Sequence, residues 1–313
     1  MKYYTDETMQ QIIHELQVEL LKSEPDALIS FQVINPDILS SAYAGKRITL
    51  EGRDYIYRGY KAWVDLAQLL FCKMRTPKVV SDSIVELSFT KLNRDDSFHT
   101  TQVEDISEKY GTESHFSEIL KSEEPAFAFA YLKALEAVKI GERLRVLNLG
   151  INTGDEFETI KKMLGIETFS KIDFTGIDHS QSAINMAKDR FPTGNMHFFA
   201  HDINQIDELK LEKFDLIVSI GTLQSPSINF KPFFSSLVQN YLSRDGAVIL
   251  GFPNCRWIDG EMVYGAKAPN YAYSEMSIVI KDIYYCKKYL QQHKFRVTVT
   301  GKDYLFLTAT SIR

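Results

Sequence analysis

The second half of the chain alternates short, nearly continuous apolar runs with longer segments of mixed polarity. After a first run that starts at Arg145, the others are Phe174–Asp178, His197–Ile203, Phe214–Ile220, Gly246–Phe252, Phe295–Thr300 and Tyr304–Thr310. Continuous apolar runs are typical of strands buried on both faces of a parallel sheet. The last two runs are joined by a link too short for a parallel crossover, so they must pair antiparallel. The pattern predicts an α/β fold with a doubly wound, seven-stranded, mostly parallel sheet and a C-terminal antiparallel hairpin.

The first half of the chain has a different pattern. Three of its segments carry apolar residues at helical spacing or begin with a good first helical residue, and we predict helices over Thr5–Leu21, Tyr60–Met74 and Pro125–Val138. Thr5 is the expected N-cap of the first helix. Ile48–Tyr57 alternates as a short hairpin does, with Glu51 and Gly52 at its turn. We therefore expect two domains, a mostly helical N-terminal domain over residues 1–138 and the sheet domain over residues 139–313.

The first strand of the sheet domain runs into a glycine-bearing turn, and the second strand ends on Asp178. This is how a doubly wound sheet holds an adenosine, with backbone at the turn and an acid on the ribose hydroxyls. A dinucleotide turn places a pyrophosphate at the helix N-terminus. Here the helix opens with Asp155 and Glu156, which would repel a diphosphate but not a cationic sulfonium. The turn therefore favours S-adenosylmethionine over a dinucleotide.

With these motifs in order, residues 143–313 resemble a class I S-adenosylmethionine-dependent methyltransferase. The family's first-strand pattern, acid-x-Gly-x-Gly-x-Gly, falls on Asn148, Gly150, Asn152 and Gly154. Asparagine tolerates the left-handed backbone at the second glycine position. Asn148 is a larger departure, because in the family the acid helps hold the charged amino acid end of the cofactor. An amide keeps the hydrogen bond and loses the charge, which Asp155 or Glu156 would have to supply.

The resemblance implies the rest of the cofactor site. Asp178 would bind the ribose hydroxyls, and Asp202, at the end of the third strand, would accept from the adenine amino group. Three neighbours complete the expected set of cofactor residues, namely His179, Ile203 and Ser219. The product would be S-adenosylhomocysteine.

The methyl acceptor should lie beyond the carboxyl ends of the fourth and fifth strands, because ligands of open parallel sheets bind there. The fourth strand is followed by Gly221 and lacks the Asn/Asp-Pro-Pro-Tyr motif of enzymes that methylate amide or base nitrogens. The connection Pro253–Glu275 is long enough to be a binding loop, or it only covers the end of the sheet. We expect the acceptor pocket between this loop and the N-terminal domain, lined by Gly221, Asn254, Arg256, Trp257 and Tyr264, with Tyr60 and Arg58 from that domain.

In the stretch around Tyr55–Trp63, Arg53, Arg58 and Lys61 alternate with aromatic residues. Such a mixture can stack on a base or clamp an anion. It is more often half-buried core with solvated basic rims, and we favour that interpretation. The stretch nevertheless keeps open the alternative of a methyltransferase that modifies tRNA or rRNA.

Composition bears on the expected location and partners of the protein. The chain has 313 residues, a net charge of −5 and three cysteines, and it lacks an apolar run of membrane-spanning length. We expect a cytoplasmic protein with no membrane partner and no metal site, and with His197 and His201 in structural roles. The leading hypothesis is methyl transfer to a small-molecule acceptor. The alternatives are RNA modification and a non-catalytic binding protein that retains the fold. The acceptor atom, a general base, the oligomeric state and the role of the N-terminal domain stay open.

Overall fold

The computed structural model describes residues 1–93, 120–225, 227–253, 256–258, 261–263, 277–302 and 304–312. The chain forms two compact units. The first comprises Met1–Thr101 with Trp257–Met262, and the second comprises Gln102–Arg256 with Val263–Arg313. No helix in the described ranges is long and apolar enough to cross a membrane.

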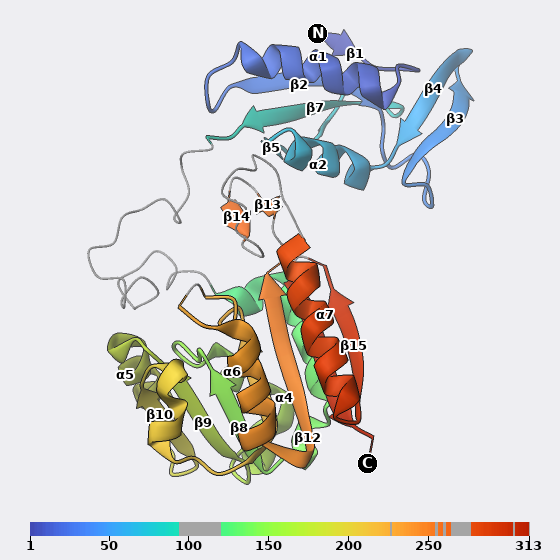
Figure 1. Cartoon of the computed structure of the whole chain (residues 1–313). Helices are drawn as coiled ribbons and strands as arrows, with labels where there is room; N and C mark the ends of the chain where they lie inside the picture. Colours follow the sequence, from blue (N-terminus) through green and yellow to red (C-terminus); the bar gives the residue numbers. More distant parts are fainter. Residues whose placement is uncertain are drawn as a thin grey trace. The chain divides into compact units, whose positions relative to one another are not determined.

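The second unit is built on a seven-stranded sheet in the order β10-β9-β8-β11-β12-β16-β15 (Figure 1). Its strands are β8 (Arg145–Leu149), β9 (Asp173–Asp178), β10 (Met196–Ala200), β11 (Phe214–Ile220), β12 (Leu242–Pro253), β15 (Phe295–Gly301) and β16 (Tyr304–Ser311). The first five strands in this order pair parallel, and β16 pairs antiparallel with both β12 and β15. The predicted mostly parallel sheet with a C-terminal antiparallel hairpin is confirmed.

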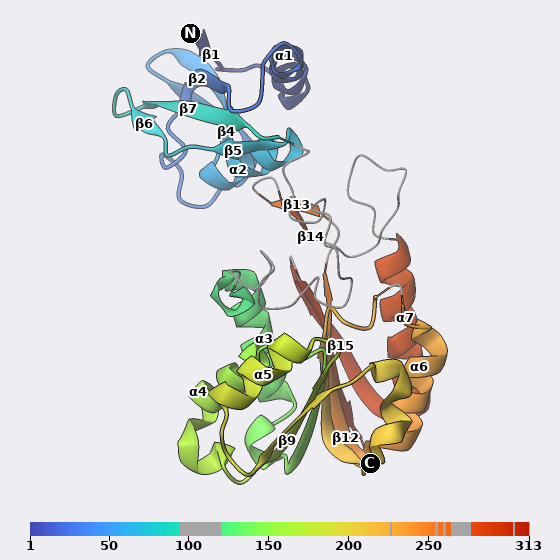
Figure 2. The ribbon, with the colours of Figure 1, turned by 90° about the vertical axis from the view of Figure 1, so that its left-hand side faces the viewer.

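Helices cover both faces of this sheet, as Figure 2 shows. One face carries α3 (Pro125–Ala137), α4 (Asp155–Phe169) and α5 (Gln181–Arg190), and the other carries α6 (Phe230–Ser236) and α7 (Ser277–Gln292). Short turns of 3-10 helix lie at Lys121–Glu123 (η4), Ile140–Glu142 (η5) and Ile203–Leu209 (η6), and a π-helical turn lies at Leu237–Tyr241 (η7). Two separate apolar cores result, one on each side of the sheet.

The alternation along β8 decides which way its side chains point. Val146 belongs to the core beneath α3, α4 and α5, whereas Leu147 and Leu149 belong to the core beneath α6 and α7. Because successive side chains of a strand point to opposite faces, Asn148 points to the same side as Val146. The only polar side chain in the interior of β8 thus faces α3 and α4.

The first unit contains a sheet in the order β1-β2-β7-β5, with β6 paired to β7, and a separate β3–β4 hairpin. Its elements are β1 (Lys2–Tyr3), α1 (Met9–Leu21), β2 (Leu28–Ile34), β3 (Ala44–Leu50), β4 (Arg53–Arg58), α2 (Tyr60–Leu69), β5 (Cys72–Met74), β6 (Lys78–Val79) and β7 (Ile84–Lys91). The prediction of a mostly helical N-terminal domain is therefore wrong. The strands β2 and β7 bury about every second side chain against α1 and α2, the period of two that is typical of a strand.

Local details of the first unit also differ from the prediction. The N-cap of α1 is Thr8 rather than Thr5, because Thr8 and Gln11 form a reciprocal capping box. Helix α2 ends at Leu69, since Phe71 takes a left-handed φ of 59° and the chain continues as β5. The predicted hairpin is confirmed.

Helix α3, which we predicted from Pro125 as part of the N-terminal domain, packs on the large sheet instead. The ring of Phe127 meets that of Phe306 edge-on with centroids 5.5 Å apart, and the ring of Tyr131 stacks on Phe306 at 6.0 Å. A helix packed in this way is part of the sheet-bearing unit.

The small β13–β14 pair, Arg256–Ile258 with Glu261–Val263, follows β12 in the chain.

Candidate functional site

The turn after β8 depends on two glycines with positive φ, Gly150 and Gly154. Gly150 has a φ of 76°, and a Cβ there would lie 1.9 Å from the Thr222 hydroxyl oxygen. Gly154 has a φ of 93°, and a Cβ there would lie 2.7 Å from the ring of Phe191. Between them Asn152 takes the left-handed conformation, with a φ of 47°. Glycine is therefore required at both positions for two reasons. A positive φ is unfavourable for other residues, and a neighbouring side chain leaves no room for a Cβ.

The Asp178 carboxylate at the end of β9 is fixed against this turn. Its Oδ2 accepts the Asn152 backbone N–H at 2.9 Å, and its Oδ1 accepts the Ser180 backbone N–H at 3.0 Å. The side chain is buried, while the neighbouring His179 imidazole is half exposed with its Nδ1 3.4 Å from Asp178 Oδ1. Each carboxylate oxygen can still accept a further hydrogen bond. Asp178 is thus an oriented acceptor beside the glycine turn.

Asn148 is an anomaly in the interior of the sheet. Its side chain is 1% exposed, and neither its Oδ1 nor its Nδ2 meets a hydrogen-bonding partner within the described part of the chain. A buried amide left without partners costs about 1–3 kcal/mol. Native proteins retain such groups rarely, and each calls for an explanation. A buried amide without partners lowers the stability of the ligand-free chain. Its retention is consistent with a site where a polar ligand supplies those partners.

Two carboxylates open helix α4, and they differ in their surroundings. Asp155 accepts from the Arg190 guanidinium, with 2.6 Å between Oδ1 and Nη1, so its charge is already paired. Glu156 has no ion pair among the described residues, and burial, followed by repulsion from Asp155 and Asp178, raises its pKa from 4.5 to about 8. Asp155 and Glu156 are the two acids that could supply the negative charge that Asn148 lacks. Of these, only Glu156 has no ion pair among the described residues.

Tyr131 adds a further unpaired polar group on the same side of the sheet. Its side chain is 1% exposed, and its hydroxyl has no hydrogen-bonding partner in the described ranges. Burial raises the pKa of Tyr131 well above its ordinary value, and the nearby Glu156 carboxylate raises it further. Sequence analysis missed Tyr131, because a tyrosine on an apolar helix face has no signal that separates it from the core.

The other predicted cofactor residues lie at neighbouring strand ends. Asp202 Oδ1 accepts the backbone N–H of Asn204 at 2.9 Å and thereby caps η6, and Ile203 is buried behind it. Ser219 is buried near the end of β11, where its hydroxyl donates to the Leu149 carbonyl at 3.2 Å. Asp202 therefore has one oxygen engaged locally, whereas the Ser219 hydroxyl proton is used within the sheet.

The predicted acceptor residues are only partly described. Gly221 follows β11 with a φ of 74°, and a Cβ there would lie 2.6 Å from the hydroxyl oxygen of Tyr304. Asn254 and Tyr264 lie outside the described residues, as do the side chains of Arg256 and Trp257 on β13. The expected pocket between the Pro253–Glu275 loop and the N-terminal domain stays a prediction.

The two N-terminal candidates, Tyr60 and Arg58, have contrasting environments. Tyr60 is 48% exposed, whereas Arg58 is 3% exposed and packs over the Trp63 ring, with 5.6 Å from Cζ to the ring centroid. Trp63 and Tyr57 are each 1% exposed. The aromatic residues of this stretch are thus core, apart from Tyr60.

A polar pair near the end of β11 was also missed. The Gln224 amide donates to Asp282 Oδ2 on α7 at 3.5 Å, while its own oxygen is buried without a partner among the described residues. Burial raises the pKa of Asp282. The signal could not come from sequence, because the two residues are far apart in the chain.

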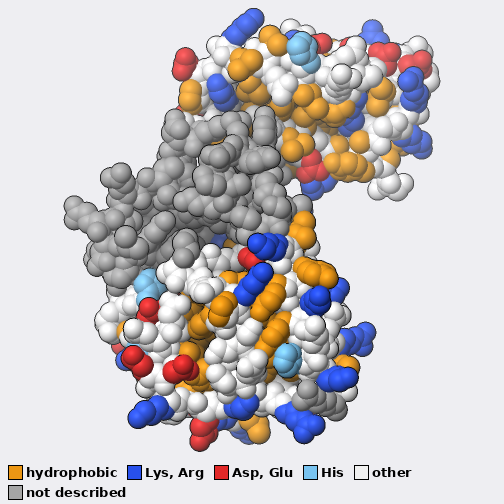
Figure 3. Space-filling model, in the orientation of Figure 1, with side chains coloured by type: hydrophobic (Ala, Val, Ile, Leu, Met, Phe, Trp, Pro, Cys, Tyr) orange, Lys and Arg blue, Asp and Glu red, His pale blue; other side chains and the backbone are white. Residues whose placement is uncertain are grey.

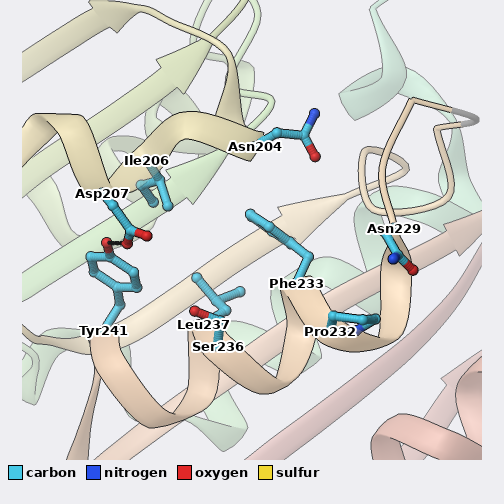
Figure 4. A pocket seen from close by; sticks show the side chains of 9 residues that line it. All are labelled: Asn204, Ile206, Asp207, Asn229, Pro232, Phe233, Ser236, Leu237 and Tyr241. Atoms are coloured by element: carbon cyan, nitrogen blue, oxygen red, sulfur yellow. Dashed lines mark hydrogen bonds between the residues drawn. The ribbon is translucent and has the colours of Figure 1, made fainter.

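A hollow of about 270 Å³ lies on the other side of the sheet, between η6 and the α6–η7 segment (Figure 4). Within it the Tyr241 hydroxyl donates to the Asp207 carboxylate. Burial, together with this bond, raises the pKa of Tyr241 to about 12. None of its lining residues belongs to the glycine turn, so this hollow is distinct from the strand-end site.

His197 on β10 and His201, which follows this strand, have structural partners. His197 Nε2 lies 2.9 Å from Asp173 Oδ1, and His201 Nε2 lies 3.0 Å from the Gln205 carbonyl oxygen.

Comparison with known proteins identifies the family of this chain. Residues 140–296, half of the chain, match the family described as "Methyltransferase domain". A search of curated proteins found no match. The chain therefore belongs to this methyltransferase family, and the sheet-bearing unit is the domain of an S-adenosylmethionine-dependent methyltransferase. Membership implies S-adenosylmethionine as the methyl donor.

Several solved structures are similar to the chain. A TehB-like SAM-dependent methyltransferase from Corynebacterium glutamicum is 18% identical, with 58% of this chain and 86% of that chain covered and a TM-score of 0.37. The N-methyltransferase NodS from Bradyrhizobium japonicum is 19% identical, with 61% and 90% covered and a TM-score of 0.42. A SAM-dependent methyltransferase from Aquifex aeolicus is 19% identical, with 63% and 98% covered and a TM-score of 0.42.

Proposed function

We propose that the protein transfers the methyl group of S-adenosylmethionine to a small-molecule acceptor, with the cofactor bound over the carboxyl ends of β8, β9 and β10. The observation that carries the proposal is the buried Asn148 amide, whose oxygen and nitrogen find no partner among the described residues. It stands at the acid position of the family's first-strand pattern and points to the side of the sheet that carries α3 and α4. A ligand with both an ammonium and a carboxylate group would satisfy the amide oxygen and the amide nitrogen together.

The other residues fit the same cofactor. The Gly150–Gly154 turn has two positions without a side chain, Asp178 supplies an oriented carboxylate for the ribose hydroxyls, and Asp202 keeps one oxygen for the adenine amino group. His179 and Ile203 flank these acids, while Ser219 braces the end of β11 through its bond to Leu149. When bound, the cofactor supplies an activated methyl group on a sulfonium. Positioning of the acceptor can provide much of the remaining rate.

The missing charge at Asn148 is supplied by Glu156 in this proposal. The amino acid end of the cofactor carries an ammonium group, and an amide cannot neutralise it. Asp155 is paired with Arg190, whereas Glu156 has no ion pair among the described residues and burial raises its pKa to about 8. An approaching ammonium would favour the ionised carboxylate and thus lower its pKa.

Calorimetry tests the cofactor site directly. S-adenosylhomocysteine should bind, and Asn148→Ala should weaken it by about tenfold, the effect of one hydrogen bond to a charged group. The matched ligand is 5′-methylthioadenosine, which lacks the amino acid end. Its affinity should be the same for both proteins. Equal weakening of the two ligands would contradict the role of Asn148, and absence of binding would contradict the whole site.

The proposal of a small acceptor rests on charge and on burial. The net charge is −5, and the stretch that could have formed an RNA-binding surface has Tyr57, Arg58 and Trp63 buried. The polar groups proposed for the acceptor side are Gln224 and Asp282, together with the predicted residues Gly221, Asn254, Arg256 and Tyr264.

Labelled cofactor distinguishes the acceptor classes. The protein is incubated with methyl-labelled S-adenosylmethionine and either a small-molecule extract or total RNA. Label should enter the small-molecule fraction and not the RNA. Label in the RNA would overturn the choice of acceptor and leave the cofactor site intact.

A further inference from the structure

The N-terminal unit contains a hollow of its own, of about 500 Å³. It is an open hollow lined by the start of α1, the β3–β4 hairpin and one side of α2, all within residues 1–93. Hydrophobic side chains gather over the part of this unit around α2 (Figure 3). The volume lies in the range of about 300–1,000 Å³ that is typical of small-molecule sites.

Arg58 is the only fully buried charged group that lines this hollow. Its guanidinium donates from Nη1 to the Ile56 carbonyl oxygen at 3.2 Å and from Nη2 to the Glu7 carbonyl oxygen at 2.6 Å. Both acceptors are neutral, and within the described residues no carboxylate forms an ion pair with Arg58. A guanidinium has five N–H donors, so three of them are not used by these bonds.

A buried charge without a counter-ion is unfavourable, and proteins pair such charges or place them where a ligand pairs them. Burial lowers the pKa of Arg58, and the interaction with the Glu7 carboxylate offsets this only in part. Because an arginine stays charged in proteins, the missing negative charge has to come from an anion, and loss of a proton from Arg58 cannot replace it.

The walls of the hollow determine the rest of the ligand. They are mainly apolar, and the aliphatic contributors are Met9, Ile13, Ile56, Leu66 and Leu69. The one carboxylate on the lining, that of Asp65, is already bonded to the Tyr43 hydroxyl and to the Lys61 ammonium. At the rim lies a second cation, the exposed Arg47. A positive group at the side of an apolar hollow suits an anion with an apolar body.

We propose that this hollow binds an organic carboxylate with a flexible aliphatic body, its carboxylate on Arg58 and its chain along Met9, Ile13 and Leu66. A carboxylate matches the planar fork of a guanidinium in two parallel hydrogen bonds. All the groups involved lie in the N-terminal unit, so the inference goes beyond the proposed methyl transfer and does not depend on it.

The probe is octanoate, titrated calorimetrically into the full chain. Octanoate should bind in the micromolar to millimolar range, 1-octanol at least about tenfold more weakly, and octylamine not at all. Equal affinity for octanoate and octanol would mean that only the apolar walls matter and would overturn the proposal. Absence of octanoate binding at millimolar concentration would overturn it as well.

Substitutions at an exposed wall position test the charge without disturbing the core. Leu69 is 75% exposed and lines the hollow. Leu69→Asp should weaken octanoate by about threefold to tenfold through like-charge repulsion, whereas the matched Leu69→Lys should preserve or improve binding. Identical affinities for the two variants would contradict the proposal.

Arg58 itself is tested by Arg58→Lys, which keeps the charge and removes the fork. Octanoate binding should fall by about tenfold or more. Thermal unfolding shows whether this variant is folded, and if it is not, the Leu69 pair alone decides. S-adenosylhomocysteine binding serves as the control in all variants and should not change, so failure here is distinguishable from failure of the cofactor site.

Discussion

The backbone N–H of Asn152 donates to Asp178 Oδ2 at 2.9 Å and thereby ties the turn after β8 to the end of β9. The turn contributes a left-handed residue and the strand contributes a buried carboxylate. The same carboxylate is the proposed acceptor for the ribose hydroxyls, so in this proposal one group has both a structural and a binding role.

Asp178→Ala should therefore impair stability and cofactor binding together. Removal of the carboxylate leaves the Asn152 and Ser180 amides without their acceptor, at a cost of about 1–3 kcal/mol. Affinity for S-adenosylhomocysteine should fall by about tenfold or more. Thermal unfolding and calorimetry measure the two effects. Asp202→Ala is the comparison, since its cap on η6 is exposed and its loss should affect binding more than stability.

Gly150→Ala should be strongly destabilising. Its φ of 76° costs an alanine about 1–2 kcal/mol, and the added Cβ would meet Thr222 at 1.9 Å. Gly194→Ala is the matched control, because no heavy atom lies within 4 Å of a Cβ there and its φ is not positive. Denaturant unfolding should show a large loss for the first variant and little change for the second. Similar losses in both would show that the clash is relieved easily.

Asn148→Leu should raise stability and abolish cofactor binding. A leucine removes the two unpaired polar atoms from the interior and should stabilise the ligand-free protein by about 1–3 kcal/mol. The same change deletes the groups proposed for the amino acid end of the cofactor. An increase in melting temperature with loss of S-adenosylhomocysteine affinity is the expected combination. A destabilised variant would show that the amide is satisfied within the folded protein.

Glu156 should make stability depend on pH. Its pKa in the folded chain is raised from 4.5 to about 8, mainly by burial. Between these values the folded state holds a proton that the unfolded state has lost, so stability falls as pH rises through this range. Glu156→Gln has no such proton and should remove this part of the dependence. The measurement is the melting temperature of both proteins across the window.

Cofactor binding should show the opposite trend. An ammonium group favours the ionised Glu156, so affinity for S-adenosylhomocysteine should rise as pH increases toward about 8. Glu156→Gln should bind more weakly and without this rise. Parallel pH profiles of the two proteins would assign the charge to another group.

A structural feature could be predicted from the sequence when it depends on residues close together in the chain. The Glu51–Gly52 turn was predictable, because Gly is well fitted to a two-residue hairpin turn. In the structure both residues take a positive φ, 52° and 76°. The continuous apolar strands of the large sheet were predictable for the same reason. By contrast, α1 could begin at Thr5 or at Thr8, and only the reciprocal bond with Gln11 decides between them.

The candidate site shows the same division. The positions of Gly150, Asp178 and Asp202 follow from motif order along the chain. The difference between Asp155 and Glu156 does not, because it depends on Arg190, which folds back from the end of α5 to pair with Asp155. Neither the isolation of the Asn148 amide nor the meeting of Gln224 with Asp282 has a sequence signal, since both arise from packing between distant segments.

The position of β16 has a consequence for how the domain assembles. β16 follows β15 in the chain but lies between β12 and β15 in the sheet. β15 is therefore synthesised before the strand that will hold it, and it cannot join the sheet until Tyr304–Ser311 has inserted beside β12. Phe306, in the middle of β16, also completes the core against α3. Closure of the sheet by β15 and burial of α3 therefore both depend on β16.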